Sequence, residues 1–141
     1  SGRQCAELRT QLTPTDVVPK AVELARAYND ALLVVERNNH GAAVLALLEA
    51  QKYEPLYHQR GKPGWLTTSV SRPDMLATLH AALAETPALF MSERLLRECR
   101  NFVRQANGRG EARAGEHDDC VMAMAIALAA RQEKLTGRTL Q

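Results

Sequence analysis

Three carboxylates in this sequence stand where they could bind a metal ion. Glu36 directly follows the apolar run 31–35, and Asp118 and Asp119 are adjacent, just before the apolar run 121–130. Ligand sites of open α/β sheets lie beyond the carboxyl ends of strands, and Mg²⁺ or Mn²⁺ prefers carboxylate and water oxygens. If the acids converge, two such ions could activate a water and stabilise the leaving oxygen in phosphodiester cleavage.

Each acid also has a simpler explanation. Glu36 could be a solvated turn residue paired with Arg37, and Asp118 or Asp119 could be the N-cap of the helix that follows. Two adjacent acids exceed what a cap requires, and His117 before them adds a group that titrates near neutral pH. The residues alone leave both interpretations open.

Arginines in the C-terminal half predict a contact with phosphate. They fall at helix-like intervals and continue onto a predicted hairpin: Arg94, Arg97, Arg100, Arg104, Arg109 and Arg113. Guanidinium groups bind phosphate through paired hydrogen bonds, so this run of arginines is a candidate DNA track. Its last three members, Arg104, Arg109 and Arg113, are the residues we expect to contact DNA. The alternative is a solvated helix face.

Composition excludes several classes of protein. The chain has 141 residues, of which 45% are apolar and 24% charged, as in one folded domain. Its net charge of +2 means that nucleic-acid affinity must come from a local patch. The sequence contains no P-loop motif, export leader or bilayer-length apolar segment. Cys5, Cys99 and Cys120 are far apart and form no CxxC motif, so we expect a reducing cytoplasm and neither disulfides nor a zinc ribbon.

Alternating strands and helices predict an α/β domain with a mixed sheet. Hydrophobic spacing and turn residues place strands over 5–12, 31–35, 56–58 and 88–91. Helices are predicted over 18–28, 43–51, 71–83, 92–99 and 117–135, with a β-hairpin over 102–113.

Three blocks of the chain together resemble the C-terminal nuclease domain of tailed-phage terminase large subunits. They are LLVVERNNHGAAVL at 32–45, GWLTTSVSRPDML at 64–76 and FVRQANGRGEARAGEHDDCVMAMAIAL at 102–128. The likeness covers nearly the whole chain. It implies a ribonuclease H-like mixed sheet flanked by helices, and a Mg- or Mn-dependent endonuclease that cuts concatemeric double-stranded viral DNA during packaging.

The resemblance also implies roles for particular residues. Glu36 matches the family's second acid, and Asp119, followed closely by Asp118, is the first choice as the later metal ligand. Asn38 and His117 match polar companions of these acids. The hairpin around Asn107 and Gly108, which carries all three candidate arginines, resembles an element that approaches DNA.

One departure from the family is expected to matter. The family's first acid is an Asp on a strand upstream of the segment resembling 5–12, so residues 1–141 are expected to form a partial nuclease domain that lacks the first strands. The separate ATPase motor lies outside this chain. The two-metal site would then be incomplete and the fragment inactive, with an open sheet edge at which a second copy could pair.

For the parent protein, the resemblance implies the portal and the small terminase subunit as partners. It places that protein in the cytoplasm of an infected or lysogenic bacterial host. Two alternatives remain open. One is another ribonuclease H-like nuclease, such as a junction resolvase or transposase core, and the other is a non-catalytic DNA-binding or assembly module.

Overall fold

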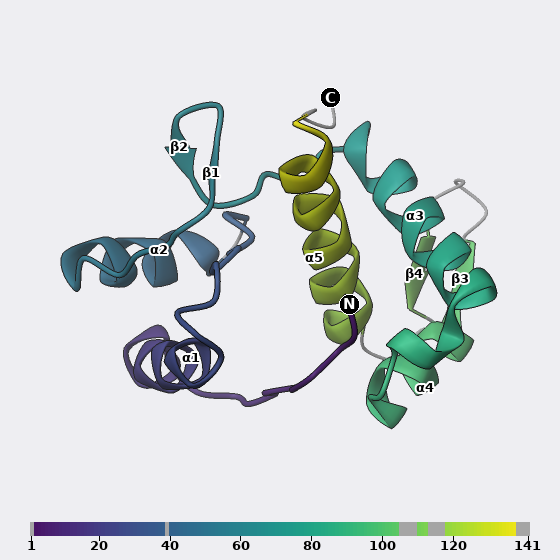
Figure 1. Ribbon diagram of the computed structural model, residues 1–141, viewed down its shortest axis with the longest axis horizontal. Coiled ribbons are helices and arrows are strands. Elements are labelled where there is room, and N and C mark those ends of the chain that lie inside the picture. Colours follow the sequence, from purple (N-terminus) through teal and green to yellow (C-terminus); the bar gives the residue numbers. More distant parts are fainter. Residues whose placement is uncertain (1, 39, 105–109, 113–117, 138–141) are drawn as a thin grey trace. The chain divides into compact units, whose positions relative to one another are not determined.

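The computed structural model describes residues 2–38, 40–104, 110–112 and 118–137 (Figure 1). The chain divides into two compact units. One unit is Leu8–Thr67, and the other combines Ser1–Glu7 with Thr68–Gln141. Glu36 therefore belongs to the first unit, and the adjacent aspartates belong to the second.

Helices α1 (Pro14–Ala27) and α2 (Gly41–Ala50) supply the core of the first unit. The helix predicted over 18–28 is present but begins earlier, because the Thr13 hydroxyl caps it by accepting a hydrogen bond from the Asp16 amide. Apolar side chains at helical spacing meet in one cluster: Val18, Val22, Ala25, Leu45, Leu48, Tyr53 and Leu56. This core supports the extended segment between the two helices.

That segment differs from the buried central strand predicted over 31–35. Its residues are half-buried, and it makes single parallel bridges, from Leu33 to Leu56 and from Glu36 to Trp65. Leu56 and Trp65 are each the single bridging residue of their segment. The chain between these two residues forms a hairpin of β1 (His58–Gln59) and β2 (Lys62–Pro63). The prediction of a regular strand over 31–35 is therefore wrong.

Helix α5 (Asp119–Thr136) packs against α3 (Ser71–Glu85) and α4 (Glu93–Asn101) in the second unit (Figure 1). All three helices were predicted from hydrophobic periodicity and are confirmed. Their buried apolar side chains are Met75, Leu79, Leu95, Val121, Met122, Ala125, Ile126, Ala129 and Ala130. The alanines of α5 have no bulky side chain to separate the helices, so neighbouring backbones can approach closely.

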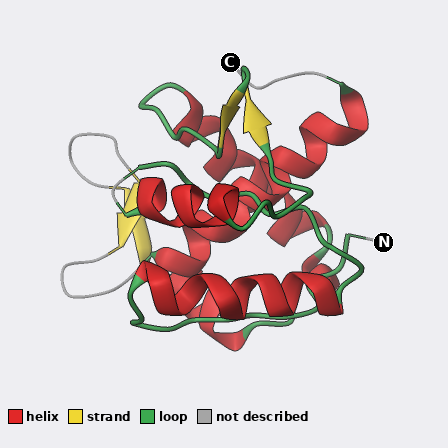
Figure 2. Ribbon diagram, turned by 90° about the vertical axis from the view of Figure 1, so that its left-hand side faces the viewer, coloured by secondary structure: helices red, strands yellow, loops and turns green. Residues whose placement is uncertain are grey.

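The predicted hairpin after α4 is also present. Strand β3 (Phe102–Arg104) pairs antiparallel with β4 (Gly110–Ala112). In the described part of the chain, the sheets are this ribbon and the β1–β2 ribbon, which Figure 2 shows as two short pairs of yellow strands among the helices. The expected mixed sheet is therefore replaced, within these residues, by two ribbons and isolated parallel bridges.

Two other predicted strands are absent. Residues 5–12 form no regular structure, and 88–91 overlaps a 3₁₀ turn, η1 (Pro87–Leu89). The Gln4 amide donates to Leu89 O at 2.8 Å, and its side-chain oxygen accepts from the amides of Met91 and Ser92 at 3.0 Å. A side chain therefore satisfies the amides of Met91 and Ser92.

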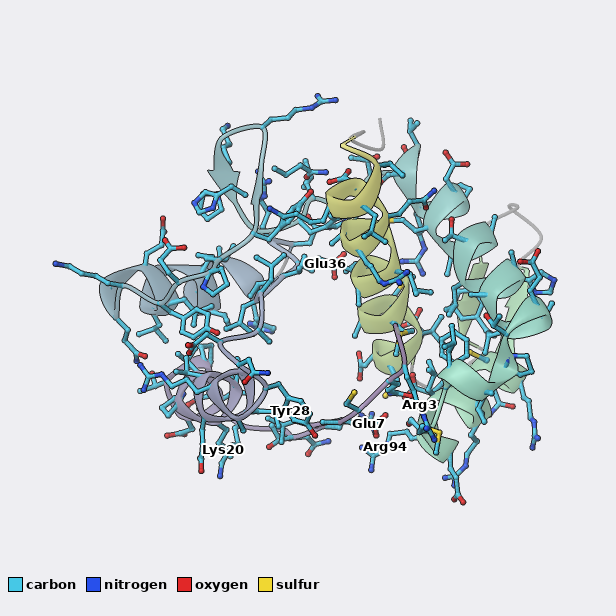
Figure 3. All side chains as sticks on the ribbon, viewed as in Figure 1. Arg3, Glu7, Lys20, Tyr28, Glu36 and Arg94 are labelled. Carbon is cyan, nitrogen blue, oxygen red and sulfur yellow. The ribbon has the colours of Figure 1, made fainter. Side chains whose placement is uncertain are left out.

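An ion pair also holds the N-terminal residues against the segment that begins α4. Arg94 lies 3.2 Å from Glu7, which also accepts a hydrogen bond from the Ser92 hydroxyl. Figure 3 shows Arg3, Glu7 and Arg94 gathered beside α4. Residues 3–7 therefore form an irregular strap on the second unit, where the sequence predicted the beginning of a strand.

Two general features concern the whole described chain. None of its helices is long and apolar enough to span a membrane. All three cysteines lie in the described residues and none forms a disulfide. Burial, with a smaller contribution from the charge of Glu98, raises the pKa of the Cys99 thiol.

Candidate functional site

Close packing of backbone fixes the position of Glu36. A Cβ at Gly41 would lie 1.6 Å from the carbonyl oxygen of Glu36, so only glycine fits at the start of α2. Gly64 has φ +81°, and a Cβ there would lie 2.7 Å from the carbonyl oxygen of Val35. That oxygen accepts a hydrogen bond from the Trp65 amide at 2.8 Å. The two glycines thus allow the segment ending in Glu36 to lie directly against α2 and Trp65.

Arg37 does not neutralise Glu36. Its Nη2 donates to the carbonyl oxygen of Gly64 at 2.9 Å and contacts Gln59 Oε1 at 3.5 Å. In the part of the chain that the structure describes, no cation pairs with the Glu36 carboxylate. The interpretation of Glu36 as a turn residue paired with Arg37 is therefore wrong.

The side-chain amide of Asn38 is a polar neighbour of Glu36 and also contacts the backbone of Thr67. Asn38 Nδ2 lies 3.5 Å from Glu36 Oε1 and donates to Thr67 O at 3.1 Å. The Thr67 hydroxyl oxygen is buried and has no hydrogen-bond partner within the described residues. Buried polar groups are almost always satisfied, so this hydroxyl is suited to a water or a ligand. Figure 3 labels Glu36 at the end of its extended segment.

Asp118 stands at the N-cap position of α5 but does not cap the helix with its side chain. Its Oδ2 instead lies 3.3 Å from Nη2 of Arg72, on the first turn of α3. Asp119 is the exposed first residue of α5, where the helix dipole favours negative charge. Asp118 therefore occupies the N-cap position that the simpler explanation expected, but its side chain pairs with Arg72 and makes no cap hydrogen bond.

Glu98 on α4 does the capping instead. Its Oε2 accepts hydrogen bonds from the amides of Cys120 at 2.7 Å and Val121 at 3.2 Å. Glu98 is only 8% exposed. The sequence analysis missed this residue, although its position three residues after Leu95, on the inward stripe of an otherwise charged helix, was a usable signal.

Arg72 was missed as well. The turn before α3 is closed reciprocally, because the Thr68 amide donates to Ser71 Oγ and the Ser71 amide donates to Thr68 Oγ1, both at 3.0 Å. The Arg72 amide then donates to Thr68 O at 3.0 Å. Two features of the sequence could have drawn attention to Arg72. It lies at the start of a predicted helix, and it belongs to the block 64–76 that resembles terminases.

The structure brings some of the predicted site residues together within each unit. Glu36 lies beside Asn38 in the first unit, and Asp118 adjoins Asp119 in the second. Among the described residues there is no cluster of three or more His, Cys, Asp or Glu side chains arranged to hold a metal. The carboxylates nevertheless have the donor chemistry that hard divalent cations prefer. The metal site remains a prediction.

The predicted DNA contacts fall mostly outside the described residues. Arg104 ends β3, and only its backbone is described. Arg109, Arg113 and His117 lie outside the described ranges, as does Asn107 of the predicted DNA-approaching turn. Their roles also remain predictions.

Comparison with known proteins shows a similarity to a phage terminase nuclease. No family model matches the chain, and no curated protein matches it significantly. A solved structure does, the large terminase nuclease from thermophilic phage G20c with bound cobalt, at 27% identity and a TM-score of 0.63. The match covers 85% of this chain and 63% of that one, so this chain spans less than two thirds of its neighbour. The fold is thus similar to that of a phage large terminase nuclease.

Proposed function

We propose that this chain is part of the nuclease domain of a phage DNA-packaging terminase, with a ribonuclease H-like fold. Its reaction would be metal-dependent cutting of concatemeric double-stranded DNA. The observation that carries the proposal is the similarity to the G20c terminase nuclease across 85% of the chain at 27% identity. The sequence blocks around Glu36 and around Asp118 and Asp119 independently resemble the same family.

Glu36, Asp119 and Asp118 would hold the metal. The fit rests on their surroundings. Glu36 has an amide neighbour and no cation partner among the described residues, and Asp118 does not cap α5 with its side chain. A bound Mg²⁺ or Mn²⁺ would activate water and stabilise the leaving oxygen. The neighbour's bound cobalt is consistent with use of a divalent ion.

The remaining residues would position these acids and the DNA. Asn38 restrains the Glu36 carboxylate through its side-chain amide, and Glu98 anchors the start of α5 through two backbone amides. His117 is proposed as a further companion of the aspartates. Three arginines would bind DNA phosphates without reading sequence: Arg104, Arg109 and Arg113.

A further acid from outside these 141 residues is proposed to complete the site. Terminase nucleases place such an acid on an earlier strand, and the present chain spans only 63% of its structural neighbour. With fewer carboxylates, a site holds two divalent ions less tightly. Contacts with the portal, the small subunit or a second copy of the chain belong to the same proposal for the parent protein.

Nicking of supercoiled plasmid in Mn²⁺ tests the proposal. The complete gene product should nick the plasmid, and both Glu36→Ala and Asp119→Asn should abolish nicking. Glu23→Ala, an exposed acid on α1, should leave nicking unchanged. Nicking that survives Glu36→Ala would contradict the assignment, whereas DNA binding without any nicking would favour a non-catalytic DNA-binding module.

A further inference from the structure

The ion pair between Arg72 and Asp118 joins the first turn of α3 to the start of α5. Nη2 and Oδ2 are 3.3 Å apart, and the two side chains are 19% and 32% exposed. An aspartate at an N-cap would ordinarily bond to its own helix. Here Glu98 already accepts from the Cys120 and Val121 amides, so the Asp118 carboxylate can face Arg72.

The surroundings of Arg72 hold its backbone in place. Thr68 and Ser71 close the preceding turn through reciprocal hydrogen bonds, the Arg72 amide bonds to Thr68 O, and Pro73 restricts the next backbone position. The guanidinium therefore starts from a fixed point on the helix. A fixed arginine loses less conformational freedom when it binds a ligand.

Arginine recognises carboxylate and phosphate through the same planar set of N–H donors. A partly exposed arginine–carboxylate pair contributes little net stability, so a phosphate can replace the carboxylate at small cost. We propose that Arg72 binds a phosphodiester of the DNA and that Asp118 occupies its guanidinium when DNA is absent. This inference rests on the proposed function, because it names a DNA contact beside the proposed metal ligands.

Duplex binding in EDTA tests the inference without cleavage. Fluorescence anisotropy of the 141-residue chain with a labelled duplex, measured over a range of salt concentrations, gives both affinity and salt dependence. Arg72→Ala should weaken binding by about threefold to tenfold and flatten the salt slope by about 0.9. Lys134→Ala removes the same charge about 24 Å along α5 and should preserve the slope.

A double-mutant cycle separates release of Arg72 from a general charge effect. Asp118→Asn should tighten DNA binding, because it removes the carboxylate that pairs with the guanidinium, and this gain should disappear in the Arg72→Ala/Asp118→Asn double variant. Asp74→Asn removes an equal charge from an exposed position in the first turn of α3. Its gain should persist when Arg72 is replaced, because that gain comes from reduced repulsion of the DNA.

Two controls test whether Arg72→Ala loses DNA binding only because it fails to fold. Thermal unfolding shows whether each variant is folded, and Arg72→Lys keeps the charge at this position. The lysine variant should keep the salt slope, because it keeps the charge, while its affinity falls in part. Unchanged DNA binding in a folded Arg72→Ala variant, or an Asp118→Asn gain that does not depend on Arg72, would overturn the inference but leave the plasmid result intact. Absence of any duplex binding by the wild-type chain would contradict both proposals.

Discussion

The carboxylate of Glu98 accepts a hydrogen bond from the Cys120 amide at 2.7 Å, so one helix caps the beginning of another. The same oxygen also accepts from Val121 at 3.2 Å. Helix N-termini leave amide protons without partners, and here two of them are satisfied by a buried side chain from α4. The adjacent aspartates are thereby positioned without having to cap their own helix.

Replacing Glu98 should destabilise the protein. Glu98→Ala leaves two amides at the start of α5 without their acceptor, and we expect the free energy of unfolding to fall by about 1–3 kcal/mol. Chemical denaturation followed by circular dichroism measures this change. Glu85→Ala, an exposed acid at the end of α3, should change it by less than about 0.5 kcal/mol. Equal effects of the two substitutions would show that the Glu98 cap contributes nothing.

Gly41 should tolerate no side chain. The Cβ of Gly41→Ala would overlap the carbonyl oxygen of Glu36, so the segment or the helix must move, at a cost of about 1–3 kcal/mol. Ala42→Ser adds one atom at an exposed neighbouring position and serves as the control. Amide chemical shifts of Glu36 and Arg37 should change in the first variant only. Unaltered shifts in Gly41→Ala would disprove the close approach.

Cys99 should react slowly with thiol reagents. Burial, followed by the charge of Glu98, raises the pKa of its thiol, and the thiolate is the reactive form. At pH 8, iodoacetamide should therefore modify exposed Cys5 faster than Cys99, as measured by peptide mass spectrometry. Similar rates at the two cysteines would contradict the raised pKa.

The same thiol predicts a pH dependence of stability. Because the folded pKa is raised above the ordinary value of 9.0, the folded state binds this proton more tightly than the unfolded state. Its contribution to stability is fully present below pH 9 and is lost as the pH rises through the folded pKa. The loss should be absent in Cys99→Ala, and denaturation curves between pH 8 and pH 10.5 provide the comparison.

The arginines of the hairpin should contribute to DNA affinity without sequence preference. Replacing them with alanine should weaken binding about equally for unrelated duplexes and lower the salt slope by about 0.9 for each phosphate that is no longer neutralised. The three substitutions are Arg104→Ala, Arg109→Ala and Arg113→Ala. An unchanged salt slope would favour the solvated-face alternative.

Local patterns in the sequence predicted the helices and the hairpin well. Apolar spacing indicated α1, and the run after Asp119 indicated α5. The Asn-Gly pair at 107–108 indicated the antiparallel pairing of β3 with β4. Each of these depends on residues close together in the chain.

The errors concern partners that are distant in the chain. The apolar run 31–35 indicated that the segment would pack against a core. It did not indicate that Leu56 and Trp65 would pair with the segment only through isolated β-bridges. Segment 5–12 does not form its expected strand, and Gln4 just before it bonds to the amides of Met91 and Ser92 through its side chain. Arg72 and Asp118 are 46 residues apart, so their pairing could not be read from spacing.

Paramagnetic broadening by Mn²⁺ tests most directly whether Glu36 and the aspartates share one metal site. In a titration of the ¹⁵N-labelled chain, amides next to Glu36 and amides next to Asp119 should broaden together, at the same Mn²⁺ concentrations. Glu36→Gln should weaken the broadening at both places, while Glu23→Gln should leave it unchanged. If Glu36→Gln removes broadening only near residue 36 and leaves that around Asp119 intact, the acids do not share a site and the account is contradicted.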